Sequence, residues 1–203
     1  MHVTCPLRRA QRFDRNRGEH LDPRSGLPYG QLLRITDPLG RIYQLHYTTI
    51  QPVFGGKGPL RLASVQTQTQ MQSQTAPLVS YRYNSQGDLS EVTDEHGRST
   101  RAFEYDRQHR MTGHRHLGGP WSRYTYASDE PGAKVVAHST EGGLGYQFDY
   151  HPQETIVTDS LGRTTRYGFD GEGDRKRLAR QTDALGHTTQ FVYNLYGHLV
   201  RHI

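Results

Sequence analysis

Four aspartates in this 203-residue chain recur in one short pattern, and each could be taken for a catalytic carboxylate. Each follows a threonine and precedes a glycine by three residues; the four are Asp37, Asp94, Asp159 and Asp183. A catalytic pair of carboxylates needs two different environments, so that one group is protonated while the other is ionised. Four copies of one environment do not meet that need. The pattern therefore predicts a structural role for these residues.

Other residues that could do chemistry are isolated in the sequence. His114 and His116 would share one face of a strand, a spacing that a metal ion could use with a third ligand such as His96 or His109. Such a third ligand would have to come from another part of the chain, so we expect both side chains to be exposed to solvent. Cys5 has no neighbour that would orient a base, and a single cysteine forms no internal disulfide. The sequence predicts no catalytic residue, metal or cofactor.

The spacing from aspartate to glycine is typical of a hairpin tip. Aspartate at the first position of a turn accepts hydrogen bonds from the backbone ahead of it. Glycine at the fourth position adopts the left-handed conformation that lets the hairpin close. We expect four such tips, with these turn residues: Asp37 and Gly40, Asp94 and Gly97, Asp159 and Gly162, Asp183 and Gly186.

An apolar pair follows each expected tip at a nearly fixed distance. Residues two apart in a strand lie on the same face, so each outgoing strand is expected to present its pair on one face. In the copy after Asp94 the pair comes one residue late, which predicts a β-bulge. The pairs are Leu45 and Tyr47, Phe103 and Tyr105, Tyr167 and Phe169, Phe191 and Tyr193.

A second kind of turn follows the aromatic residues and completes a repeat of about 19–24 residues. It is expected at 84–87, 106–109, 170–173 and 194–197, and His109 stands where the pattern has glycine. Two strands and two turns in each repeat predict an all-β antiparallel ribbon. Such a ribbon coils, because twisted sheets do not stay flat.

The composition agrees with a chain rich in strands and limits its functions. Only 33% of the residues are hydrophobic, and 22 glycines and 10 prolines favour many turns over a thick core. The net charge of +5 comes from 25 basic and 20 acidic residues, a mildly basic surface that makes nucleic acid an unfavoured partner. No apolar run is long enough to span a membrane, and the N-terminus has no apolar stretch typical of a secretory signal.

The segments YRYNSQGDLSEVTDEHGRSTRAFEYDRQHR and VTDSLGRTTRYGFD resemble the tyrosine–aspartate (YD) repeats of Rhs proteins, in the bacterial form. The resemblance covers residues 32–203, is weak over 50–79, and stops in mid-repeat at the C-terminus. It implies a ribbon that spirals into a hollow shell around a toxin, with no enzymatic role for the repeats. The implied partners are the remaining shell and the toxin. The implied route is synthesis in the cytoplasm, then type VI secretion or display on the cell surface, in competition between bacteria.

The resemblance also bears on self-cleavage, since Rhs shells usually end in a D-P-x-G motif at which the toxin is released. Here DPLG occupies residues 37–40, an ordinary repeat turn near the start of the chain, and no copy stands near the C-terminus. We expect a fragment of the shell without cleavage residues or toxin. We also expect it to self-associate through open strand edges.

Residues 1–31 differ from the repeats in composition. Their arginines and the Pro/Gly-rich connector at 21–30 predict a flexible leader rather than a contact for nucleic acid or an acidic partner. The run VQTQTQMQSQT at 65–75 fits equally a polar strand facing a cavity and an irregular insert. The arginines are Arg8, Arg9, Arg12, Arg15, Arg17 and Arg24.

Two alternatives to a shell segment stay open. One is a cell-surface module that binds carbohydrate, because exposed tyrosines and Trp121 with neighbouring arginines could stack on sugars or contact anionic glycans. The other is an enzyme, which is less favoured because no acid, base, nucleophile or metal ligands converge. Selective binding on a glycan array would separate the first alternative from a shell segment.

Overall fold

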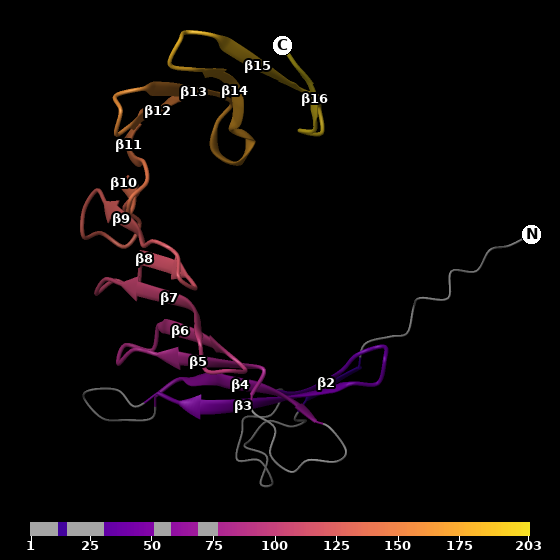
Figure 1. The fold of residues 1–203 in the computed structure, drawn as a ribbon. Coiled ribbons are helices and arrows are strands. Elements are labelled where there is room, and N and C mark those ends of the chain that lie inside the picture. Colours follow the sequence, from indigo (N-terminus) through magenta and orange to yellow (C-terminus); the bar gives the residue numbers. More distant parts are fainter. Residues whose placement is uncertain (1–11, 16–30, 51–57, 69–76) are drawn as a thin grey trace, which may run out of the picture. The chain divides into compact units, whose positions relative to one another are not determined.

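The computed structural model describes residues 12–15, 31–50, 58–68 and 77–203, and these ranges are all-β (Figure 1). They contain sixteen strands, one 3₁₀-helix and no α-helix. The strands pair antiparallel in chain order, so that successive hairpin turns lie at opposite ends of the strands. These two rows of turns form the two long edges of the ribbon. The predicted all-β antiparallel ribbon is confirmed. No helix in the described residues is long and apolar enough to cross a membrane.

Two compact units divide the chain, residues 1–103 and 104–203. In the first unit each strand pairs with the next one along the chain. The predicted boundary after residue 31 lies beside residues outside the described ranges and stays a prediction. The strands are β1 (Arg12–Arg15), β2 (Leu32–Thr36), β3 (Ile42–Thr49), β4 (Leu60–Gln68), β5 (Val79–Tyr83), β6 (Leu89–Asp94) and β7 (Ser99–Tyr105), whose last two residues belong to the second unit.

The second unit continues the same order of pairing from β8 to β16. Its elements are β8 (Met111–His116), β9 (Ser122–Tyr126), β10 (Val135–Thr140), β11 (Gly145–Tyr150), β12 (Glu154–Asp159), β13 (Thr164–Asp170), the 3₁₀-helix η1 (Gly173–Arg175), β14 (Arg177–Thr182), β15 (Thr188–Tyr193) and β16 (Leu199–His202).

The register between strands gives each sheet an aromatic face and a polar face. Tyr167 of β13 pairs with Thr155 of β12, and the next residue, Gly168, pairs with Glu154. Since successive side chains point to opposite faces, tyrosines gather on one side and charged residues on the other. We call these the aromatic face and the polar face.

The predicted bulge in β7 is confirmed. Val92 of β6 pairs with Arg101, whereas the next residue, Thr93, pairs with Ser99. Thr100 is therefore the extra residue, and the equivalent hairpins β2–β3, β12–β13 and β14–β15 pair without such a shift. The bulge returns the later aromatic pair to the register of the other copies.

No hydrophobic side chain in the described ranges is fully buried. Side chains are covered by neighbours in the same sheet, so hydrogen bonds, ion pairs and ring contacts between strands take the part that a core has in a two-layer domain. Phe169, for example, is only half-buried. Truncation of Phe169 to alanine is therefore not expected to lower the free energy of unfolding as much as at a fully buried phenylalanine.

One sequence expectation is wrong, and another is tested only in part by the described residues. The segment 170–173 is not a tight tip, because β13 runs to Asp170 and the chain then makes η1 before β14 begins at Arg177. Gly171 (φ 86°) enables this wider loop, since a Cβ there would lie 2.6 Å from the carbonyl oxygen of Arg175. The glutamine run is a strand as far as Gln68, and residues 69–76 lie outside the described residues.

Candidate functional site

Four hairpin tips, those of β2–β3, β6–β7, β12–β13 and β14–β15, share one hydrogen-bond geometry, seen clearly at Asp159. Its Oδ1 accepts hydrogen bonds from the backbone N–H of Leu161 (2.9 Å) and Arg163 (3.0 Å). The N–H of Gly162 donates to the carbonyl of Asp159, and Gly162 has φ 78°. The same contacts recur at the three other predicted tips, Asp37 with Gly40 (φ 82°), Asp94 with Gly97 (φ 72°) and Asp183 with Gly186 (φ 88°).

A basic residue directly after the glycine completes each tip. Oδ2 of Asp159 accepts from Nε of Arg163 at 2.6 Å, and Asp94 pairs with Arg98 in the same way. Sequence reasoning stopped at the glycine and missed this partner, although a basic residue at the fifth position is visible in all four copies. The four basic residues are Arg41, Arg98, Arg163 and His187.

These contacts hold the pKa of the tip aspartates below the ordinary value of 3.8. For Asp94 and Asp183 the main cause is the hydrogen bond from the side chain of Arg98 or His187. For Asp37 and Asp159 desolvation is the largest single effect and raises the pKa, but the hydrogen bonds from backbone and arginine together outweigh it. The carboxylates are therefore ionised and engaged in the turn, an arrangement without a protonated partner that acid–base catalysis needs.

Turns at the opposite edge use the same geometry with either aspartate or asparagine. Oδ1 of Asn84, Asp106 and Asn194 accepts from the N–H groups two and four residues ahead. His109 takes the place of glycine there with φ 61°, and among the described residues other than glycine it alone has a positive φ. The turn therefore keeps its shape at the cost of a conformation that disfavours a side chain.

A tyrosine at or near the end of a strand ties it to the strand before. The hydroxyl of Tyr126, at the end of β9, donates to the carbonyl of Met111, the first residue of β8, at 2.8 Å. We call this contact a tyrosine clasp. Equivalent clasps join Tyr47 to Leu32, Tyr83 to Leu62 and Tyr150 to Val135.

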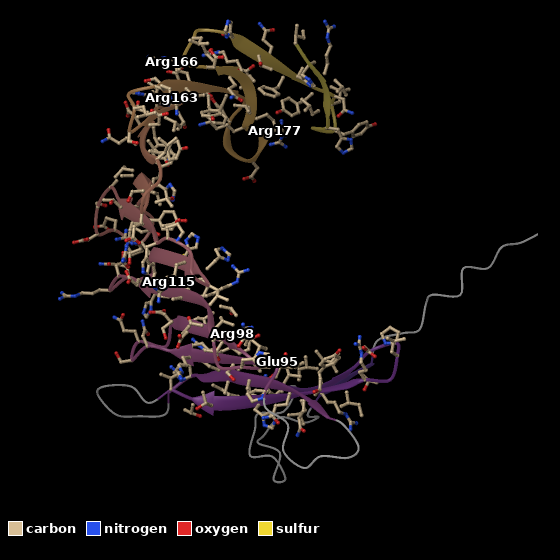
Figure 2. All side chains as sticks on the ribbon, in the orientation of Figure 1. Glu95, Arg98, Arg115, Arg163, Arg166 and Arg177 are labelled. Carbon is tan, nitrogen blue, oxygen red and sulfur yellow. The ribbon has the colours of Figure 1, made fainter. Side chains whose placement is uncertain are left out.

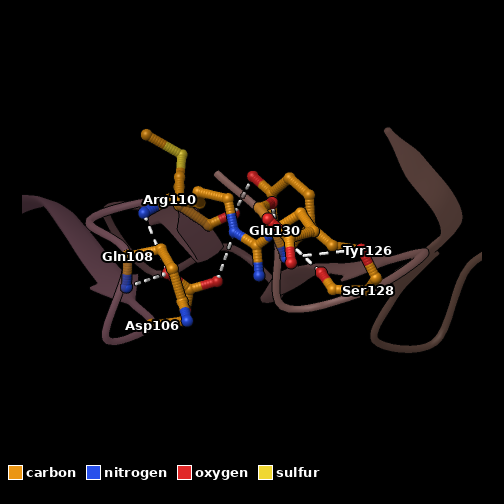
Figure 3. A network of polar contacts seen from close by, with 7 residues as sticks. Asp106, Gln108, Arg110, Tyr126, Ser128 and Glu130 are labelled. Carbon is orange, nitrogen blue, oxygen red and sulfur yellow. Dashed lines mark hydrogen bonds and ion pairs between the residues drawn. The ribbon is translucent and has the colours of Figure 1, made fainter. Parts of the chain in front are cut away.

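In two of the four clasps, the residue just before the one whose carbonyl accepts the hydrogen bond places a cation on the same tyrosine ring. Cζ of Arg110 lies 4.2 Å from the ring centroid of Tyr126, and Nζ of Lys134 lies 4.5 Å from that of Tyr150. Arg110 also donates to Oδ2 of Asp106 (2.7 Å) and to the carbonyls of Ser128 and Glu130 (Figure 3). One side chain thus joins the turn after β7 to the loop after β9.

Imidazole and phenol rings form a row across four strands on the aromatic face. His114 stacks on Tyr124 (5.7 Å between centroids), Tyr124 lies 5.2 Å from His138, and His138 stacks on Tyr146 (6.0 Å). His116 is exposed as expected, but His114 is half-buried because Tyr124 covers it and donates or accepts a hydrogen bond at Nδ1. The expectation of an exposed His114 is therefore wrong.

The other candidate ligands do not assemble into a site. Within the described ranges, no three His, Cys, Asp or Glu side chains lie close enough together to hold a metal ion. Cys5 and the arginines at 8, 9, 17 and 24 lie outside the described residues.

The polar face has its own repeated contact, in which an arginine lies over a glycine. Gly113 of β8 pairs with Arg123 of β9, which reaches across it to form an ion pair with Glu104. Gly113 is buried under this pair and under Trp121, whose ring also lies 4.5 Å from Cζ of Arg123 and 5.0 Å from that of Arg115. In β12–β14 the residues Glu154, Gly168 and Arg180 occupy the same three places.

The predicted repeat aromatics all lie in strands, and none is fully buried. Tyr47 makes a clasp, and the ring of Phe169 lies 5.0 Å from Nζ of Lys176. The remaining members, at the strand positions given above, are half-buried: Phe103, Tyr105, Tyr167, Phe191 and Tyr193. Together with the turns they hold a sheet one layer thick.

Comparison with known proteins places these repeats in a family. The RHS Repeat family matches residues 83–120. Toxin protein Tse5 of Pseudomonas aeruginosa is 34% identical over 185 residues, which cover 84% of this chain and 14% of Tse5. The probable deoxyribonuclease RhsB of Dickeya dadantii is 30% identical over 172 residues, or 83% of this chain and 11% of RhsB. The chain spans only a small part of these relatives.

A further relative is named for a different activity. The double-stranded DNA deaminase toxin A of Burkholderia cenocepacia is 33% identical over 96 residues, which cover 46% of this chain and 7% of the deaminase toxin.

Proposed function

Because the chain belongs to the RHS-repeat family, we propose that it forms part of the wall of a shell that encloses and delivers a toxin. The observation that carries the proposal is the single-layer sheet, in which tips, clasps and ring contacts recur from hairpin to hairpin and no hydrophobic side chain of the described residues is fully buried. Such a construction extends by adding hairpins, as a wall does, because each one contacts mainly its neighbours.

The names of the relatives support a role that is not enzymatic. RhsB is named a probable deoxyribonuclease, and the Burkholderia protein a DNA deaminase, two different reactions. The chain matches only 11% and 7% of them. A segment common to proteins with different chemistry is better suited to carrying a toxin than to acting on its target.

Two experiments test this role. The purified 203-residue chain, incubated with double-stranded DNA and divalent cations, should neither cut nor deaminate it; turnover by the chain would contradict the proposal. In the producing bacterium, an in-frame deletion of β6 and β7 should abolish killing of competitors while the toxin is still made. Unchanged killing would also contradict the proposal. The route we propose is type VI export from the cytoplasm.

The carbohydrate-binding alternative is less favoured by the contacts around Trp121. Its ring already lies against the guanidinium groups of Arg115 and Arg123, which occupy the surface that a sugar would stack on. A glycan array on the chain should show no selective binding. A selective signal that is lost in Trp121→Ala would restore this alternative.

A further inference from the structure

Leucines stand exposed at the tips of one edge of the ribbon. Leu39, Leu161 and Leu185 hold the third position of their turns and are 75%, 68% and 81% exposed. Turn positions usually hold small or polar residues, and single exposed leucines need no explanation. Three at one equivalent position, on the same edge, do need one.

The turn itself does not require leucine. Gln86, His96 and Gln108 occupy the same position in other turns and donate the same backbone hydrogen bond to the first residue of the turn. The leucine side chain therefore contributes nothing to the backbone hydrogen bonding of its own turn.

A cleft of about 330 Å³ lies next to two of these tips, within the second unit. Its apolar lining comes from Tyr146, Val157 and Tyr167 of the aromatic face, and from Ala184 and Leu185 of the tip between β14 and β15. Leu161 is at the neighbouring tip on the same edge. This tip lies two strand spacings, roughly 10 Å, from the tip that carries Leu185. An exposed leucine and a cleft able to receive one therefore lie side by side.

Charge around the cleft favours contact between like chains. Asp159 and Asp183 line it together with Arg163, so it does not share the net positive charge of the chain. The side chain of Arg163, at the tip of β12–β13 (Figure 2), is 56% exposed although it pairs with Asp159, and that of Asp183 is 46% exposed although it pairs with His187. An incoming Arg163 can thus meet an accessible Asp183.

We propose that this edge is an interface between two copies of the chain, in which Leu161 of each copy enters the cleft of the other. Leucine and cleft lie close together on one surface, as a two-fold interface requires, where each residue meets its partner reciprocally. Arg163 of one copy then faces Asp183 of the other. This contact goes beyond the proposed wall function and does not depend on any toxin.

Sedimentation velocity of the chain over roughly 1 to 300 μM tests the interface. The wild type should dimerise, and the double variant Leu161→Ser, Leu185→Ser should bind itself at least tenfold more weakly. Leu195→Ser is the matched control, because Leu195 is fully exposed at a tip on the opposite edge, and it should dimerise like the wild type. A monomer at every concentration, or equal association by the double variant, would overturn the proposal; the latter would assign association to open strand edges.

Disulfide trapping locates the contact. In a Cys5→Ser background, one chain carrying Leu161→Cys and another carrying Thr165→Cys, a residue of the cleft, are mixed under mild oxidation. A mixed disulfide should form rapidly. Replacing the first chain by one with Leu195→Cys should abolish it, and equal trapping from both tips would overturn the assignment.

Discussion

The guanidinium carbon of Arg110 lies 4.2 Å from the ring centroid of Tyr126, whose hydroxyl donates to the carbonyl of Met111, the residue next to Arg110. Two residues thus hold each other from both directions, one through its ring and the other through its backbone neighbour. Because the part of the chain that the structure describes has no fully buried hydrophobic side chain, contacts of this kind decide how firmly one strand is held to the next.

Arg110 should therefore contribute more than other turn arginines. Its side chain is 11% exposed and donates to one carboxylate and two carbonyls, so Arg110→Ala should cost about 2–3 kcal/mol in unfolding free energy. Arg98→Ala removes the equivalent ion pair from a tip where the side chain is 62% exposed, and should cost less than about 1 kcal/mol. Urea denaturation measures both, and equal effects would contradict the special role of Arg110.

The tyrosine clasps should each contribute one hydrogen bond. Tyr126→Phe keeps the ring and its cation but removes the hydroxyl, so a loss of about 1 kcal/mol is expected. Tyr196→Phe is the control, because Tyr196 is 85% exposed and should tolerate the change. A Tyr126→Phe chain as stable as the control would show that the clasp does not stabilise the sheet.

His109 should be improved by glycine. Its φ of 61° is unfavourable for a residue with a Cβ, and His109→Gly should raise stability by about 1 kcal/mol. The reciprocal change, Gly97→Ala at φ 72°, should lower stability by a similar amount. Thermal melting distinguishes the two directions, and a fall in melting temperature for His109→Gly would mean that the imidazole outweighs the backbone cost.

Stability should fall in acid because of the tip aspartates. The folded pKa of Asp94 and Asp183 is lowered below 3.8, so the unfolded chain binds more protons as the pH drops. The stabilisation is complete above the ordinary pKa and is lost as the pH falls through the folded pKa. Asp94→Asn should flatten this loss in urea denaturation below about pH 4.5. A variant with the same acid dependence as the wild type would exclude Asp94 as a contributor.

The sequence predicted the fold because its strongest signals are local. Asp–Gly spacing and two-residue alternation need no information from distant residues, and even the bulge near Thr100 was readable from one displaced aromatic pair. The clasps and the contacts of Arg110 with the loop after β9 were missed because they join residues 15 to 21 positions apart. The wide loop after Asp170 was missed because the glycines there serve a 3₁₀ turn rather than a tip.

Protease protection in the native gene product that contains this chain tests the wall function most directly. Proteinase K followed by mass spectrometry should reveal a protected segment outside the repeats in the wild type. That protection should disappear in Asp94→Ala, Asp159→Ala, where two tips lose the side-chain oxygens that accept their backbone hydrogen bonds. Leu195→Ser, which leaves every tip contact in place, should retain it. A wild type without any protected segment, or protection that survives opening of the tips, would contradict a wall built from these repeats.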